Sequence, residues 1–269
     1  MSKTKKLKGI DLFAGCGGFS LGVSRAGIEV VAAVEMAIEP CQTMAVNKER
    51  AFPTMKIVNA DISKLSGIDL LSMVNLKPGE LDVLFGGPPC QGFTFVNSNR
   101  SINDPRSKLM WEFVRMIQEI QPRYFVIENV PGLLSFKDFF YELLTQLEMS
   151  NYEVRFNVLD AASYLVPQTR RRVFIEGGRA DLKITPVFPE PICYDPKMIN
   201  NNQLVSPADV AVECFRKNGF RKDEVGNTWW NRKLNILMNK KNASQEVDLA
   251  VNRIIARKVF KMAQSVKSA

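Results

Sequence analysis

A cysteine stands directly after two glycines and two prolines in the segment Gly86–Phe93. The apolar run Leu81–Phe85 before it predicts a short buried strand. Because glycine permits close backbone approaches and proline fixes φ, the loop that follows this strand is expected to be stiff. A thiol on a stiff loop at the end of a buried strand, here Cys90, is suited to act as a nucleophile. The alternative is a buried structural cysteine, since free cysteine mostly packs as a small apolar side chain.

A glycine-rich turn near the start of the chain indicates a site for a nucleotide-type cofactor. The predicted strand Gly9–Phe13 is followed by the turn Ala14–Gly18 and then by a helical pattern. A second apolar run ends at Glu35, a carboxylate placed where it can bind ribose hydroxyls. A third predicted strand ends near Asp61, which could accept a hydrogen bond from an adenine amino group. Solvated strand ends are the alternative for both acidic residues.

These segments together resemble the DNA cytosine-5 methyltransferases, and the resemblance covers residues 8 to 178. The combination of Pro-Cys-Gln, Glu-Asn-Val and Gln-x-Arg-x-Arg is specific to that family. The resemblance implies an α/β fold with a doubly wound, mostly parallel Rossmann-like sheet, and it implies S-adenosyl-L-methionine as the cofactor. The matching segments stand in the family's usual order: Asp11–Gly18, Glu35, Asp61, Gly87–Gln91, Glu128–Val130 and Gln168–Phe174.

The resemblance also implies the catalytic chemistry. A thiolate that adds to carbon 6 of cytosine makes carbon 5 nucleophilic, and Cys90 is the residue expected to add. Glu128 is expected to offset the charge that develops at N3 of the base. Arg170 and Arg172 alternate on a predicted strand and so share a face, from which they can favour the thiolate or bind the base oxygen or a phosphate. An exposed edge strand is the alternative for these arginines.

The remaining expected site residues follow the family's motifs. Gln91, Thr94 and Asn129 are expected to bind the substrate, double-stranded DNA with the target base flipped out of the stack. Asn129 is also expected to orient the loop or Glu128. No metal is expected, because the chain has no histidine and no CxxC spacing. The residues expected to bind the cofactor are Phe13, Ala14, Gly15, Gly17, Gly18, Glu35, Met36, Asp61, Ile62, Pro89 and Leu109.

Composition and charge limit the classes of function. Five cysteines without disulfide-like spacing favour a reducing compartment, and no apolar run is long enough for a membrane span. With the resemblance to bacterial methylases, this leads us to expect the bacterial cytoplasm. Residues 216–269 hold 13 Lys and Arg against 4 Asp and Glu, so the net charge of +8 comes entirely from this tail. Such a basic segment attracts phosphate backbones. A solvated helix face is the alternative for this tail.

Alternating strand and helix patterns predict the parallel α/β sheet independently of the resemblance. Two late strands, Tyr152–Leu159 and Arg172–Glu176, are expected to pair at one edge of it. Three prolines within residues 186–191 predict a boundary between a catalytic domain of residues 1–186 and a basic C-terminal region of residues 187–269. Helices are expected over Pro40–Arg50, Ser107–Ile120 and Phe139–Met149.

The C-terminal region departs from the family's pattern. Family members carry a long variable recognition region and two further motifs after the arginine strand, and residues 187–269 are too short for a full version. We therefore expect the catalytic part of a split restriction-modification methylase, whose second polypeptide supplies the recognition region. A cytosine-5 methyltransferase acting on RNA and a catalytically weak cofactor-binding subunit are the alternatives.

Overall fold

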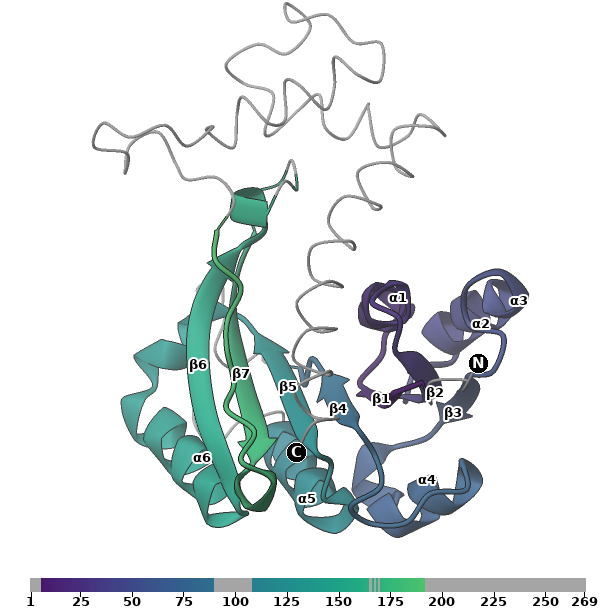
Figure 1. The fold of residues 1–269 in the computed structure, drawn as a ribbon. Coiled ribbons are helices and arrows are strands. Elements are labelled where there is room, and N and C mark those ends of the chain that lie inside the picture. The colour runs from purple at the N-terminus through teal and green to yellow at the C-terminus, as the bar shows by residue number, and fades with distance from the viewer. Residues whose placement is uncertain (1–5, 90–107, 165, 167, 169, 192–269) are drawn as a thin grey trace, which may run out of the picture. The chain divides into compact units, whose positions relative to one another are not determined.

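The computed structural model describes residues 6–89, 108–164, 166, 168 and 170–191. These residues form a seven-stranded sheet in the order β3-β2-β1-β4-β5-β7-β6 (Figure 1). Neighbouring strands from β3 to β5 are parallel, and β7 runs antiparallel to β5. The strands are β1 (Lys8–Leu12), β2 (Glu29–Glu35), β3 (Lys56–Asn59), β4 (Val83–Gly86), β5 (Tyr124–Asn129), β6 (Tyr152–Asp160) and β7 (Arg171–Arg179).

Helices cover both faces of the sheet, as a doubly wound fold requires (Figure 1). Helices α1 to α3 pack in one buried cluster with β4, and α4 to α6 pack in a second, larger cluster. The helices are α1 (Gly18–Arg25), α2 (Ile38–Val46), α3 (Lys48–Ala51), α4 (Gly67–Met73), α5 (Lys108–Ile120) and α6 (Lys137–Met149). Short 3-10 helices are η1 (Ile62–Lys64), η4 (Pro131–Ser135), η5 (Ala161–Tyr164) and η6 (Ala180–Leu182).

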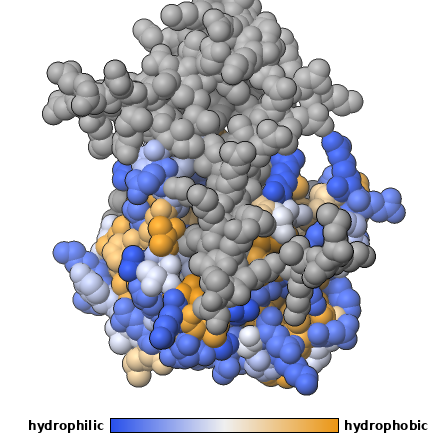
Figure 2. Space-filling view, viewed as in Figure 1, coloured by the Kyte–Doolittle hydropathy of each residue, from blue (hydrophilic) through white to orange (hydrophobic). Residues whose placement is uncertain are grey.

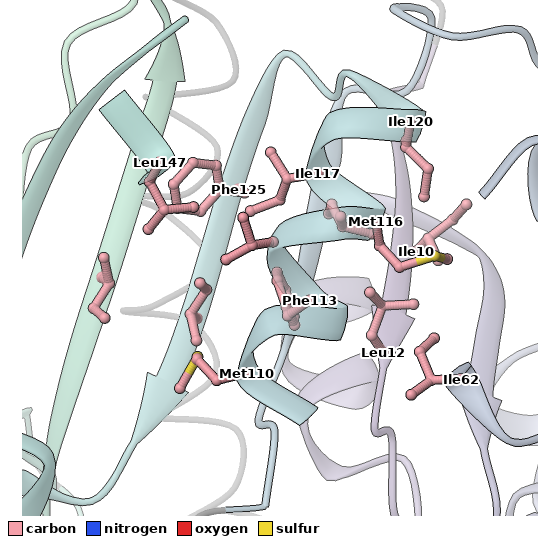
Figure 3. Close-up of a cluster of buried hydrophobic side chains, with 14 of the residues drawn as sticks. Ile10, Leu12, Ile62, Met110, Phe113, Met116, Ile117, Ile120, Phe125 and Leu147 are labelled. Carbon is pink, nitrogen blue, oxygen red and sulfur yellow. The ribbon is translucent and has the colours of Figure 1, made fainter. Parts of the chain in front are cut away.

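Helix α5 contributes one of its faces to the centre of the larger cluster. Phe113, Ile117 and Ile120 recur at helical spacing and have no exposed surface. They pack in the same cluster as Ile10 and Leu12 of the central strand β1 (Figure 3). The position of α5 against the sheet is therefore fixed by apolar packing along most of its length.

The predicted fold class is confirmed, and the predicted elements are found with bounds shifted by a few residues. The expected helix Pro40–Arg50 is two helices, because Asn47 leaves the helical conformation between α2 and α3. Helix α4 was not expected. Strands β6 and β7 are adjacent at one edge of the sheet, as predicted. The expected basic appendage lies outside the described residues, apart from residues 187–191.

The described chain divides into two compact units. Of the described residues, 6–89, 108–158 and 172–188 belong to one unit, and 159–164, 166, 168, 170–171 and 189–191 belong to the other. The predicted boundary after residue 186 stays a prediction. Hydrophilic residues cover most of the described surface on the face shown in Figure 2, with smaller hydrophobic areas between them. No helix in the described part of the chain is long and apolar enough to cross a membrane.

The antiparallel pair β5–β7 has no room for a side chain at Gly177. A Cβ atom there would lie 2.1 Å from the ring of Phe125, which faces it across the pair. We therefore expect Gly177→Ala to lower the free energy of unfolding by about 1–3 kcal/mol, the usual cost of overpacking a core. Urea denaturation measures this change. Gly18→Ala is the control, since no atom of the described residues lies within 4 Å of the added methyl group. Equal losses in both variants would contradict the prediction.

Candidate active site

The candidate site lies where the parallel strands end. Leu12, the last residue of β1, is paired with Val34 of β2 on one side and with Gly86 of β4 on the other. Gly86 is in turn paired with Ile127 of β5. Because these registers align the carboxyl ends of four strands, the segments that follow them converge at one edge of the sheet. This edge therefore contains the glycine turn, Glu35, the start of the loop to Cys90, and Glu128.

The glycine turn depends on backbone conformations that side chains disfavour. Phe13, Gly15 and Gly17 have φ angles of 58°, 54° and 85°, all in the left-handed region. The turn is held to β2 by a hydrogen bond from Ala14 N to Val34 O, 3.0 Å long. A Cβ at Gly15 would meet no atom of the described residues within 4 Å, so none of these residues fills the space beside it. A ligand can therefore approach the backbone of the turn closely.

Glu35 directs its carboxylate toward this turn. Oε2 accepts a hydrogen bond of 2.8 Å from Gly15 N, and Oε1 accepts one of 2.9 Å from Ala37 N. Asn59 Nδ2 donates to the carbonyls of Glu35 and Met36, which fixes the end of β2 to the end of β3. The side chain of Met36 is 70% exposed beside the carboxylate. The predicted ribose ligand and its apolar neighbour thus lie at the same strand end.

Asp61 begins the short turn after β3. Its Oδ1 accepts hydrogen bonds from Ser63 N and Ser63 Oγ, and these bonds lower the pKa of the Asp61 carboxyl. Ile62 is buried in the larger core cluster (Figure 3), and Leu109, in the first turn of α5, packs against that cluster. An ionised acceptor and two apolar side chains therefore come from neighbouring elements.

Glu128, at the end of β5, forms an ion pair with Arg172 of β7. Arg172 Nε lies 2.7 Å from Glu128 Oε1, and both side chains are about three-quarters buried, with 23% and 25% of their surfaces exposed. The other carboxylate oxygen, Oε2, would lie 3.1 Å from a Cβ at Gly87. The carboxylate therefore lies directly beside the backbone that leads to Cys90.

Asn129 connects the same strand end to the proline loop. Its Nδ2 donates a hydrogen bond of 3.1 Å to the carbonyl of Pro88, and its Oδ1 accepts one of 2.7 Å from Val130 N. The residue is only 3% exposed. The backbone of the loop is thus anchored to β5 at Pro88, two residues before Cys90. The next residue, Pro89, is exposed.

Four other predicted site residues are given no position at this edge. Cys90, Gln91 and Thr94 lie outside the described residues. Arg170 precedes β7 and belongs to the second compact unit, where its backbone N donates to Asp160 Oδ1 at 3.0 Å. The roles of these four residues stay predictions.

Asp11 is a site residue that the sequence analysis did not single out, although it opens the matching segment. It is fully buried under the glycine turn, and its Oδ2 accepts a hydrogen bond of 2.6 Å from Ser20 Oγ. Burial raises the pKa of Asp11 to about 7. The hydrogen bonds from Ser20 lower this pKa, and the charge of Glu35 raises it by a smaller amount. Its Oδ1 has no hydrogen-bond partner among the described residues. An acidic residue inside an apolar strand was the available signal.

A fold and a strand-end site of this kind define a class of methyltransferase, and the sequence matches one family of that class. The family described as C-5 cytosine-specific DNA methylase matches residues 7–266. The chain belongs to this family.

Individual relatives agree with this assignment. Type II methyltransferase M.AquIA of Picosynechococcus sp. is 36% identical over 70% of this chain and 76% of its own length. M.XorII of Xanthomonas oryzae is 38% identical over 68% of this chain. The crystal structure of a DNA modification methyltransferase from an E. coli prophage is 32% identical, with a TM-score of 0.57, over 70% of this chain and 53% of that one. This chain spans 43% of M.XorII, 48% of M1.HphI and 44% of M.DdeI, less than half of each.

The buried carboxyl of Asp11 makes a testable contribution to the pH dependence of stability. The unfolded chain loses this proton near pH 4 and the folded chain near pH 7, so the folded state binds more protons between these values. The free energy of unfolding should therefore fall as the pH rises from 4 to 7, with up to about 4 kcal/mol from this group. In Asp11→Asn this part of the fall should disappear, as measured by urea denaturation at several pH values.

Glu176 provides the matched comparison, because burial also raises its pKa to about 7. Glu176→Gln should remove its own part of the pH dependence and leave that of Asp11. An Asp11→Asn variant that keeps the full wild-type fall between pH 4 and pH 7 would show that the carboxyl is not buried as described.

The anchor at Asn129 should also be measurable. Asn129→Ala leaves the buried carbonyl of Pro88 without this donor, so the free energy of unfolding should fall by about 1–3 kcal/mol. Asn157→Ala is the matched control: Asn157 makes the same local bond, from Val158 N to its Oδ1, but is exposed. The control should change stability by less than about 0.5 kcal/mol. Equal effects of the two substitutions would contradict the anchoring role.

Proposed function

We propose that this protein transfers the methyl group of S-adenosyl-L-methionine to carbon 5 of cytosine in double-stranded DNA. The observation that carries the proposal is the pair Glu128–Arg172, held at 2.7 Å beside the backbone that leads to Cys90. The pair lies at the strand ends of a doubly wound sheet, in a chain that belongs to the C-5 cytosine-specific DNA methylase family.

The described residues fit S-adenosyl-L-methionine. Open space beside Gly15 allows a ligand to reach the backbone of the glycine turn. The Glu35 carboxylate at the end of β2 is directed to the same turn and can accept hydrogen bonds from ribose hydroxyls. Asp61 is an acceptor for an adenine amino group, with Met36 and Ile62 as apolar neighbours. When bound, the cofactor supplies a methyl group on a positively charged sulfur.

The chain's own residues prepare the base to receive this group. The sulfur of Cys90 adds to carbon 6 of a flipped-out cytosine, and the displaced electron pair makes carbon 5 nucleophilic while negative charge develops toward N3. Arg172 holds the Glu128 carboxylate in position, and Glu128 offsets this charge by holding a proton, taken up from solvent, against N3. Asn129 fixes the loop that carries Cys90. Once carbon 5 carries the methyl group, its proton passes to a solvent base, the electron pair re-forms the double bond between carbons 5 and 6, and the thiolate leaves.

Arg170 stays a predicted ligand of the base oxygen or a neighbouring phosphate, and Gln91 and Thr94 stay predicted ligands of the substrate. The basic residues 216–269 support DNA as the substrate through their charge. A second polypeptide that carries the recognition region belongs to the same proposal and stays a prediction.

Covalent trapping tests the proposed function. DNA that contains 5-fluorocytosine should bind the wild-type protein covalently in the presence of S-adenosyl-L-methionine, because fluorine cannot leave carbon 5 as a proton does. Cys90→Ser should form no covalent complex, and Cys214→Ser, which replaces a cysteine outside the matching motifs, should be trapped as the wild type is. Denaturing gel electrophoresis measures the complex.

Two outcomes would overturn the proposal. Trapping that persists in Cys90→Ser would remove this residue as the nucleophile. Transfer of labelled methyl groups to structured RNA but not to DNA, with the same protein, would show that DNA is not the substrate. If the chain needs a second polypeptide, trapping is repeated with that polypeptide added.

A further inference from the structure

Arg115, in the third turn of α5, makes four polar contacts that hold it in one orientation. Its Nε lies 2.8 Å from Glu112 Oε2, and its Nη1 lies 2.7 Å from Glu119 Oε1. Both glutamates are on α5, three residues before and four residues after Arg115, so the helix itself orients the guanidinium. We call Arg115, Glu112 and Glu119 the Arg115 cluster.

The third nitrogen of the guanidinium, Nη2, donates to residues outside α5. Arg115 Nη2 donates to the carbonyl of Ile62 at 2.8 Å and to the carbonyl of Leu65 at 3.0 Å. These two carbonyls belong to the turn that contains η1, about 50 residues earlier in the chain. The planar fork of arginine can serve both glutamates and both carbonyls at once, which the single ammonium group of lysine cannot do.

A second contact holds the end of the same turn. Glu119 Oε2 accepts a hydrogen bond of 2.5 Å from Gly67 N, the first residue of α4. A Cβ at Gly67 would lie 2.9 Å from the Cβ of Glu119, so this approach requires glycine. The whole segment Ile62–Gly67 is therefore fixed to α5 by polar contacts.

This segment begins at the proposed adenine end of the cofactor site. Asp61 directly precedes the carbonyl of Ile62 that Arg115 binds, and on its other side Ala60 N donates to Glu35 O at 3.1 Å. Asp61 is thus held between the end of β2 and the Arg115 cluster. Helix α5 also carries Leu109, so the cluster joins the two elements that supply Asp61, Ile62 and Leu109.

We propose that Arg115 is a positioning residue for S-adenosyl-L-methionine, which fixes the Asp61–Ile62 turn in the conformation that recognises adenine. This inference rests on the proposed function, and it adds a residue that is not among the predicted site residues. A purely structural ion pair on the surface of one helix would contribute little to folding. The contacts to the two carbonyls are what give Arg115 its specific effect on the turn.

Calorimetry with the full chain tests this role without any turnover. The ligands are S-adenosyl-L-homocysteine and S-inosyl-L-homocysteine, in which an oxygen replaces the adenine amino group. The wild type should prefer the adenosyl compound, because Asp61 accepts a hydrogen bond from the amino group. Arg115→Gln should bind the adenosyl compound about tenfold more weakly and should lose most of this preference.

Three further substitutions separate positioning from general stability. Glu112→Gln removes one ion pair but leaves both carbonyl contacts of Arg115, so affinity should change less than twofold. Arg115→Lys keeps the charge but not the fork, so it should lose the preference as Arg115→Gln does, and it replaces that variant if the glutamine form does not fold. In Asp61→Ala, adding Arg115→Gln should cause little further loss of affinity, because both act on the same contact.

The outcomes distinguish this inference from the proposed function. If Glu35→Ala weakens binding but both Arg115 variants bind with wild-type affinity, the inference is overturned and the cofactor site stays in place. Equal weakening for both ligands, with the preference intact, would show a general loss of structure and would also overturn it. A wild-type chain that binds neither ligand would overturn both proposals.

Discussion

Hydrogen bonding between β1 and its two parallel neighbours fixes where the central strands end, and the candidate site depends on this register. Leu12 is paired with Val34 and with Gly86, which brings the glycine turn, Glu35 and the proline loop to one edge. The β1–β4 pair is closely packed, since a Cβ at Gly86 would lie 2.0 Å from the Leu12 carbonyl. A shift of one residue would turn each side chain to the opposite face of the sheet. The register therefore decides at once which groups meet at the cofactor and which are buried.

The same edge contains two local features that oppose folding. Phe13 has a left-handed backbone conformation, and Asp11 is fully buried close to the charge of Glu35. Both features lower the stability of the folded state. The apolar packing of α5 against β1 offsets this loss of stability. Strain and buried charge at a strand end are common where a backbone must be presented to a ligand. Their concentration around the glycine turn agrees with its proposed role.

The sequence predicts the parts of the fold and the site that depend on local pattern. Apolar periodicity and the residues that interrupt it predict the positions of the strands, the glycine turn, Glu35 and helix α5. The contacts of Arg115 with Ile62 and Leu65 were not predictable, because they join segments about 50 residues apart and depend on the packing of α5. The division between α2 and α3 was missed because nothing in the local pattern marks Asn47 as a helix end. The roles of Cys90, Gln91 and Thr94 rest on sequence alone.

The strand order has a consequence for how the chain folds during synthesis. Ile10 of β1 pairs with Ala32, 22 residues later, and with Leu84, 74 residues later. The three strands β1, β2 and β3 can therefore associate on the ribosome while β4 and β5 are still being translated. The edge of β1 that later pairs with β4 remains unpaired during that interval. Long-range parallel pairing of this kind forms slowly. The half of the sheet that carries Glu35 and Asp61 is thus complete before the half that carries Glu128 exists.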